Sequence, residues 1–265
     1  CIACNEHIKF RLFLSRARQL GYDTIATGHY AQLDYDWTND TFFLAEGLDS
    51  FKDQSYVLFP LDRDVLRHLL LPLGRYTKSE IRAKAKSLNL CVAGKPDSQE
   101  ICFIPSNDYG TFLKREKSEA VQLQTRGAIR TKEGKILGEH SGFFNYTRGQ
   151  RRGLGVASSE RLYVIETDPE KNEVVVGAKE DILNQTCEVG KVNWFLKPEE
   201  GMSLQAQVKI RSQHKKTTAT LEVRNDPQSV KVIFDEPQEA ITPGQAAVFY
   251  DGPRVLGGGW IDSFE

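Results

Sequence analysis

Two cysteine-containing segments are the first candidates for chemistry in this 265-residue chain. Cys1 and Cys4 form a Cys-x-x-Cys pair, a spacing that redox, zinc and iron–sulfur sites all use. The pair precedes a predicted helix that begins near Asn5, and a helix N-terminus favours the thiolate form of a cysteine. The alternative is a pair of cysteines without a chemical role. Cys102 lies between two apolar residues, which by itself is more typical of a buried core position.

Other candidate residues lie at a strand end and in two basic stretches. His29 follows Gly28 after the expected strand 23–27, where it either makes a structural hydrogen bond or contacts a ligand. Residues 148–155 (RGQRRGLG) mix arginine with glycine, and guanidinium groups match phosphates in geometry. The second basic stretch contains Lys209, Arg211, His214, Lys215 and Lys216. For both stretches, a solvated charged turn is the alternative.

The first part of the chain predicts an α/β arrangement that would position these residues. Apolar residues at Ile8, Leu12, Phe13, Ala17 and Leu20 predict an amphipathic helix from Asn5 to Leu20. A short buried strand over 23–27 follows, then a strand over 41–45 and a loop that passes into a short helix over 50–59. Ligands bind open α/β sheets beyond the carboxyl ends of the strands, so Gly28 and His29 fall at a favourable place.

A capping box predicts a second helix. Thr77 and Glu80 have the spacing that satisfies free N–H groups of a first helical turn, and the helix should run to about Leu88.

Beyond about residue 115 the sequence predicts an all-β region. Short alternating runs separated by turn signals are typical of a β-sandwich or barrel. We expect three parts: an α/β domain over 1–112, a small β-rich domain over 113–178 and a closed β-barrel over 179–265. The runs that predict strands are 127–131, 161–167, 173–177, 204–210, 218–224, 229–234 and 246–250.

Composition limits the class of protein. The formal net charge is −1, so any nucleic acid would have to bind a local basic patch. Five cysteines are an odd number in a chain too large to need a disulfide framework, which favours a reducing compartment such as the cytoplasm or an organelle matrix. No apolar run approaches the roughly 20 residues of a membrane helix, so no membrane partner is expected.

Together these segments resemble the tRNA 2-thiouridylase family, and the likeness spans essentially the whole chain. No single motif is decisive, but jointly they are highly specific. The matching stretches are CNEHIKF (4–10), ATGHY (26–30), KDQSY (52–56), DSQEICFI (97–104), GEH (138–140) with TRGQRRGLG (147–155), and IFDEP (233–237) with TPGQAAVFY (242–250).

The resemblance implies a fold and a reaction. The fold is the remainder of a Rossmann-type PP-loop nucleotide-binding domain, a central β-rich domain and a C-terminal β-barrel. In such enzymes ATP, with Mg²⁺, adenylates the C2 oxygen of the wobble uridine of tRNA, and a cysteine persulfide then delivers sulfur as AMP leaves. A separate persulfide carrier protein supplies the sulfur.

The resemblance also implies roles for single residues. Cys102 matches the persulfide cysteine, and Cys4 matches the second catalytic cysteine, so we expect the two to approach each other. Gly28 matches a nucleotide-contacting glycine. The positions that match tRNA contacts are His29, Lys52, Asp53, Gln54, Arg211, Ser212 and Gln245, and we expect Lys209, Arg211 and Gln245 to lie on one tRNA-facing surface.

The chain departs from the family pattern in two ways. The Ser-Gly-Gly-x-Asp-Ser phosphate loop is absent, which we interpret as truncation ahead of Cys1, so that this chain alone should lack much of the ATP site. Many members also have Asp where this chain has Cys1. The set Cys1, Cys4 and Cys102 resembles the pattern of related thiolation enzymes that hold a [4Fe–4S] cluster, and thiolates suit such a cluster.

Three other functions compete with this interpretation. A different PP-loop adenylating ligase would not need Cys4 or Cys102. A non-catalytic RNA-binding module would bind RNA without ATP turnover. A structural zinc protein would use Cys1 and Cys4, but no second ligand pair is visible in the sequence.

Overall fold

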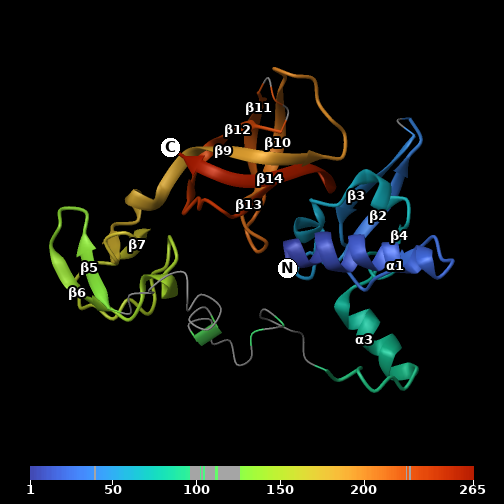
Figure 1. The fold of residues 1–265 in the computed structure, drawn as a ribbon, viewed down its shortest axis with the longest axis horizontal. Helices are drawn as coiled ribbons and strands as arrows, with labels where there is room; N and C mark the ends of the chain where they lie inside the picture. Colours follow the sequence, from blue (N-terminus) through green and yellow to red (C-terminus); the bar gives the residue numbers. More distant parts are fainter. Residues whose placement is uncertain are drawn as a thin grey trace. The chain divides into compact units, whose positions relative to one another are not determined.

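The computed structural model describes residues 1–38, 40–95, 102, 104, 111–112, 126–224, 226 and 228–265 (Figure 1). The chain divides into two compact units. The first unit comprises Cys1–Pro96, Thr186–Glu236 and Pro243–Glu265, and the second comprises Asp97–Gln185 and Pro237–Thr242.

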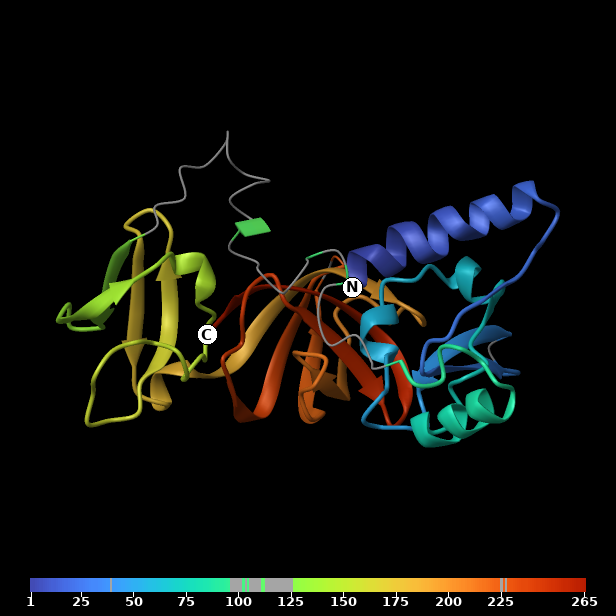
Figure 2. The ribbon, with the colours of Figure 1, turned by 90° about the horizontal axis from the view of Figure 1, so that it is seen from below.

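The first unit begins with one long helix, which is prominent in Figure 2. Its first part is the π-helix η1 (Cys4–Leu12), and it continues as the α-helix α1 (Phe13–Gln19). The buried positions are Asn5, Phe10, Leu14 and Ala17, at spacings that shorten from five residues to three. The helix was predicted correctly, but of its expected apolar face only Ala17 is buried. A π-helix bonds i to i+5 rather than i to i+4, so the apolar period expected of an α-helix does not apply there.

Two short strands that follow the helix in the sequence pair in parallel. Strand β1 (Ile25–Ala26) pairs in parallel with β4 (Leu69–Leu70). The 3₁₀-helix η2 (Ser55–Leu58) and the helix α2 (Arg63–Leu66) lie between them in the sequence. The predicted strand over 23–27 is therefore present but shorter, and only its residue Ile25 is buried.

The predicted capping box is confirmed. The hydroxyl of Thr77 accepts a hydrogen bond from the N–H of Glu80, and the Glu80 carboxylate accepts one from the N–H of Thr77. These bonds satisfy donors of the first turn of α3 (Lys78–Ser87), which ends one residue before the predicted position.

A closed six-stranded barrel forms the C-terminal part, as predicted (Figure 1). Its strand order is β13-β10-β11-β12-β9-β14, and antiparallel pairing of β13 with β14 closes it. The strand β14 also pairs with β3 (Thr41–Glu46), which forms a hairpin with β2 (Ala31–Asp36). The barrel strands are β9 (Leu183–Trp194), β10 (Ser203–Lys209), β11 (Thr217–Val223), β12 (Val230–Glu239), β13 (Ala246–Asp251) and β14 (Arg254–Phe264).

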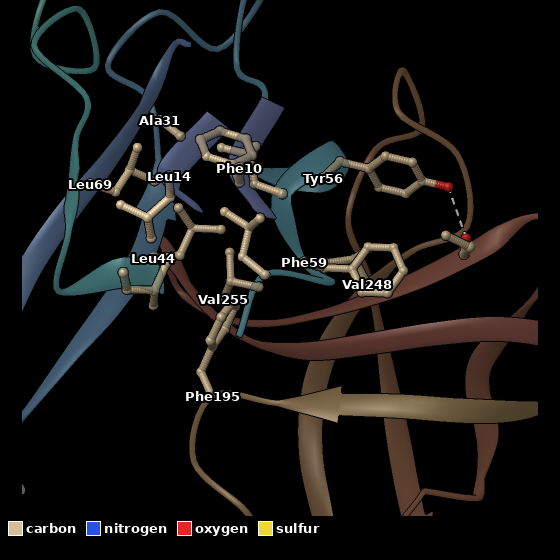
Figure 3. Packing of buried hydrophobic residues seen from close by; sticks show 14 of the residues in the cluster. Phe10, Leu14, Ala31, Leu44, Tyr56, Phe59, Leu69, Phe195, Val248 and Val255 are labelled. Atoms are coloured by element: carbon tan, nitrogen blue, oxygen red, sulfur yellow. Dashed lines mark hydrogen bonds between the residues drawn. The ribbon is translucent and has the colours of Figure 1, made fainter. Parts of the chain in front are cut away.

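The core of the first unit joins the helix and the hairpin to the barrel (Figure 3). Phe10 of the helix and Leu44 of β3 belong to the same buried cluster as Val248 of the barrel. The hydroxyl of Tyr56 donates a hydrogen bond to the backbone oxygen of Ala246 at 2.9 Å, the dashed line in Figure 3. The barrel therefore helps to hold η2 and the loop before it in place.

The second unit contains a four-stranded sheet in the order β6-β5-β8-β7, with β5 and β8 parallel. Its core consists mainly of Ile129, Val164, Val174 and Val176. Among the described helices, none is long and apolar enough to cross a membrane. The strands are β5 (Gly127–Thr131), β6 (Ile136–His140), β7 (Tyr163–Asp168) and β8 (Glu173–Gly177).

Candidate functional site

Cys4 lies in the first turn of the long helix. The N–H of Asn5 donates to the backbone oxygen of Cys1 at 2.9 Å, the first hydrogen bond of that turn. Cys1 is exposed and Cys4 is half-buried, so both thiols are accessible. Asn5 is buried, and its amide donates to the backbone oxygen of Val57 at 3.2 Å. This bond ties the start of the helix to η2.

A hollow of about 610 Å³ opens beside the long helix, at the carboxyl end of β1. It brings together three residues that the sequence singled out, Gly28, His29 and Gln54. Four lining residues were not predicted for the site: Ile8, Lys9, Phe13 and Thr27.

Ile8, within the π-helix, and Phe13, directly after it, line this hollow instead of the core. Both were expected in the buried stripe, but they are 58% and 50% exposed. The hollow therefore combines an apolar wall from the helix with polar groups from the loop after β1. Its size is typical of sites for small organic ligands.

The environment of His29 keeps its imidazole neutral at physiological pH. The ring is buried, with its centroid 5.5 Å from that of Phe10, and its Nδ1 lies 2.9 Å from the hydroxyl oxygen of Thr27. Burial, the larger cause, and the nearby positive charge of Lys9 together lower the pKa of His29 from 6.5 to about 4. A neutral imidazole can donate or accept a hydrogen bond, but it does not form an ion pair with a phosphate.

The loop that carries Lys52, Asp53 and Gln54 is held tightly. The side-chain oxygen of Gln54 accepts a hydrogen bond from the N–H of Tyr30 at 3.0 Å, and its own N–H donates to the Tyr30 oxygen at 2.8 Å. This pairing fixes Gln54 against the chain segment that follows Gly28 and His29. Lys52 is half-buried.

Asp53 has a buried carboxylate that is bonded within the protein. Its side chain is 4% exposed and accepts hydrogen bonds from the N–H of Gly47 at 2.9 Å and from Ser55 at 2.9 and 3.1 Å. The Lys209 ammonium lies 3.3 Å from the Asp53 carboxylate and 3.3 Å from that of Glu46.

The sequence suggested that Lys209 lies on one tRNA-facing surface with Arg211 and Gln245. This prediction is wrong for Lys209, which is not exposed. Its side chain is 11% exposed, because the strand β10 places it over the Tyr250 ring and between the two carboxylates. Lys216 completes the group with a 2.7 Å ion pair to Glu46. We call Glu46, Asp53, Lys209 and Lys216 the ion cluster.

The remaining predicted tRNA contacts lie at the barrel surface. Arg211, just after β10, is half-buried, and Ser212 is exposed. Gln245 is exposed, and its backbone oxygen accepts a hydrogen bond from Ile261 at 2.8 Å.

All five cysteines fall within the described residues and all are free thiols. Cys4 belongs to the first unit and Cys102, which is exposed, to the second, so their expected approach stays a prediction. Cys187 is buried, and burial raises its pKa to about 12, which keeps this thiol protonated.

The described residues do not form a metal site. No three or more His, Cys, Asp or Glu side chains among them gather closely enough to hold a metal ion. Cys1 and Cys4 belong to the first unit and Cys102 to the second, so the arrangement of the three around a [4Fe–4S] cluster stays a prediction.

These features define a class of protein in which an α/β region with a ligand hollow is combined with a β-rich domain and a closed β-barrel. Models of three protein families match successive parts of the chain. They are the tRNA methyl transferase HUP domain over residues 1–106, the tRNA methyl transferase PRC-barrel domain over 111–178 and the aminomethyltransferase beta-barrel domain over 184–261.

Curated relatives give a more specific result. The chain is 46% identical to the tRNA-specific 2-thiouridylase MnmA of Solibacter usitatus, with 99% of this chain and 72% of the relative covered. It is also 46% identical to the protein of the same name from Carboxydothermus hydrogenoformans, covering 99% and 71%, and 44% identical to that of Koribacter versatilis, covering 98% and 71%. The chain belongs to the tRNA-specific 2-thiouridylase family of enzymes.

Proposed function

We propose that this protein catalyses the ATP-dependent 2-thiolation of the wobble uridine of tRNA, with Cys4 and Cys102 as its sulfur-handling residues. The observation that carries the proposal is the hollow at the end of β1, which is lined by Gly28, His29 and Gln54. The long helix that lines it on one side also contains Cys4. Cys4 is about one helical turn from the lining residues Ile8 and Lys9, so a ring bound in the hollow would be close to a thiol.

The lining suits a nucleotide. Ile8 and Phe13 offer apolar surface to the flat face of a base, and the neutral imidazole of His29 can hydrogen-bond to a base edge. Lys9 supplies a positive charge for a phosphate. Gly28 leaves room for close approach, since a β-carbon there would meet only the Leu73 side chain, at 3.5 Å.

We assign two roles to the other predicted tRNA contacts. Arg211, Ser212, Gln245 and Lys52 would bind phosphate and sugar groups and thereby set the position of the tRNA. Asp53 would act as a positioning residue, because its carboxylate is occupied by Gly47, Ser55 and Lys209.

The reaction would proceed in balanced steps. ATP, bound with Mg²⁺, transfers AMP to the C2 oxygen of uracil and releases pyrophosphate. The outer sulfur of a Cys102 persulfide, loaded by a carrier protein, attacks C2, and AMP leaves with its electron pair. The Cys4 thiolate then attacks the Cys102 sulfur, so that a Cys4–Cys102 disulfide forms and the released pair completes the C2 thiocarbonyl. A thiol reductant regenerates the two cysteines.

The [4Fe–4S] alternative would also require Cys1. We derive no step through a cluster, because Cys1 and Cys4 belong to one unit and Cys102 to the other. Substitution of Cys1 in anaerobically purified full-length protein separates the routes. Full thiolation by Cys1→Ser without iron would support the persulfide route, and joint loss of iron, brown absorbance and thiolation would support the cluster.

The proposal is tested by measuring 2-thiouridine in tRNA digests by mass spectrometry, with full-length protein, ATP and a persulfide donor. We expect Cys4→Ser and Cys102→Ser each to abolish the product. Cys91→Ser is the matched control, because Cys91 is also an exposed free thiol, and it should retain activity. Full 2-thiouridine formation by a Cys4→Ser/Cys102→Ser double variant would refute the roles of these cysteines. ATP turnover without any 2-thiouridine from the unsubstituted protein would favour a different adenylating ligase.

A further inference from the structure

The loop between residues 148 and 162 of the second unit has no role in the reaction described above. It contains a hollow of about 330 Å³ whose lining includes Arg151, Gly153, Gly155, Ser158, Glu160 and Arg161. We call this the glycine–arginine loop.

Several anchors preform the loop. The N–H of Gly149 donates to the Val164 oxygen at 2.8 Å, and the N–H of Val164 donates to the Gln150 oxygen at 2.9 Å. The Gln150 side chain accepts from the N–H of Thr147 and donates to the oxygen of Arg152. Further along, Leu154 is buried in the core of the second unit. The hollow therefore does not require a ligand to take its shape.

The backbone of the hollow offers free donors. Gly153 and Gly155 have φ values of +75° and +71°, a conformation that other residues rarely adopt. Within the described part of the chain, neither glycine donates its N–H to any acceptor. Backbone N–H groups in turns that contain left-handed residues are typical anion-binding elements.

The guanidinium groups of the hollow are also available. Arg151 and Arg161 are exposed, and neither forms an ion pair with a carboxylate of the described residues. Arg148, at the start of the loop, differs, because it donates to the backbone oxygen of Ile165 and to the Asn184 side chain. The loop thus keeps one arginine for its own structure and presents others to the solvent.

We propose that the glycine–arginine loop binds the ribose–phosphate backbone of tRNA. Planar guanidinium groups pair with phosphate oxygens through two parallel hydrogen bonds. The Glu160 carboxylate would repel a phosphate placed directly against it, but it can accept a hydrogen bond from a ribose 2′-hydroxyl beside the phosphate. The identity of the RNA rests on the proposed function, whereas the phosphate chemistry does not.

The test is tRNA binding by full-length protein, measured by fluorescence anisotropy with an unmodified transcript over a range of salt. We expect Arg151→Ala/Arg161→Ala to weaken binding and to reduce the slope of log K against log salt by roughly 1.4–1.8, that is about 0.7–0.9 per lost phosphate contact. Arg151→Lys/Arg161→Lys should keep the slope but weaken binding, because lysine does not form the paired bonds.

The matched control is Arg126→Ala/Lys135→Ala, which removes the same charge from exposed positions of the same unit. An equal change in slope from this control would overturn the proposal in favour of net charge alone. If Arg151→Ala/Arg161→Ala leaves tRNA binding unchanged, the proposal is also overturned. An acidic protein partner for the loop would then be the alternative. Binding without thiolation by the unsubstituted protein would refute the proposed function and leave this inference standing.

Discussion

The two basic stretches of this chain look alike in sequence but have opposite surroundings. In the barrel, Lys209 and Lys216 lie against Glu46, Asp53 and the Tyr250 ring. In the glycine–arginine loop, Arg151 and Arg161 are exposed and form no ion pair with any described carboxylate.

The difference shows that the number of cations in a stretch does not predict what they bind. The ion cluster joins a loop and a hairpin near the start of the chain to barrel strands more than 150 residues later, and its charges are satisfied internally. Buried pairs of this kind are sensitive to loss of one partner and insensitive to salt. Exposed cations have the opposite properties, so stability and salt dependence separate the two regions.

Loss of the central cation should have the largest effect. We expect Lys209→Met to lower the free energy of unfolding by about 3–5 kcal/mol, because it leaves the buried Asp53 carboxylate without its cation and removes one of the two cations that pair with Glu46. Urea denaturation measures this change. Lys215→Met, an exposed neighbour, should alter stability by less than about 0.5 kcal/mol. Equal effects of the two substitutions would contradict the buried assignment.

The buried imidazole of His29 should make the first unit sensitive to pH. Because its pKa in the folded state is about 4, below the unfolded value of 6.5, the unfolded chain binds the proton more tightly between these values. The free energy of unfolding therefore keeps its full value above pH 6.5 and decreases by about 3 kcal/mol as the pH falls toward 4.

Urea midpoints measured from pH 7.5 to 4 for wild-type protein and His29→Gln test this prediction. The substituted protein should lack this part of the pH dependence. Parallel curves for the two proteins would mean that the imidazole is protonated in the fold as readily as in the unfolded chain.

Within the glycine–arginine loop, Arg148 should behave like the ion cluster and Arg152 like a surface residue. Arg148→Ala removes charge-assisted bonds to Ile165 and Asn184 and should cost about 1.5–3 kcal/mol. Arg152→Ala should change the free energy of unfolding by less than about 0.5 kcal/mol. Thermal unfolding of both variants measures the difference, and a neutral Arg148→Ala would show that the loop does not depend on this anchor.

The smallest effect concerns Arg211, which lies two residues beyond Lys209. We expect Arg211→Ala to reduce the salt slope of tRNA binding by about 0.7–0.9, the value for one phosphate contact. Lys197→Ala, an exposed cation of the barrel domain, is the matched control and should leave the slope unchanged. An unchanged slope in Arg211→Ala would remove this residue from the tRNA surface.

Much of the fold could be predicted because its signals are local. The capping box at Thr77 needs only residues within one turn, and the alternating runs that became β5, β8, β10, β11 and β13 need only period two. The family-level motifs also pointed to Gly28, His29 and Gln54, three residues that line one hollow.

The strand β14 could not be predicted, because its centre is the run Gly257-Gly258-Gly259, which reads as a turn. A β-carbon at these positions would meet backbone oxygens of Asn193, Ala247 and Gly190 at 2.4, 2.8 and 2.5 Å. The glycines are there because the neighbouring strands approach closely, which is a property of the closed barrel and not of the local sequence.

The sequence alone determined the order of helices and strands in the capped and alternating segments, the barrel at the C-terminus and the residue types available for sulfur and nucleotide chemistry. Only the tertiary structure decided which face of the first helix lines the hollow, because the π-helical turns change the spacing of buried residues. It also decided that Lys209 is bound by Asp53 while Arg151 is left exposed. Ion pairing depends on distances between side chains, and residues 156 positions apart come within 3.3 Å only when the barrel closes against the loop.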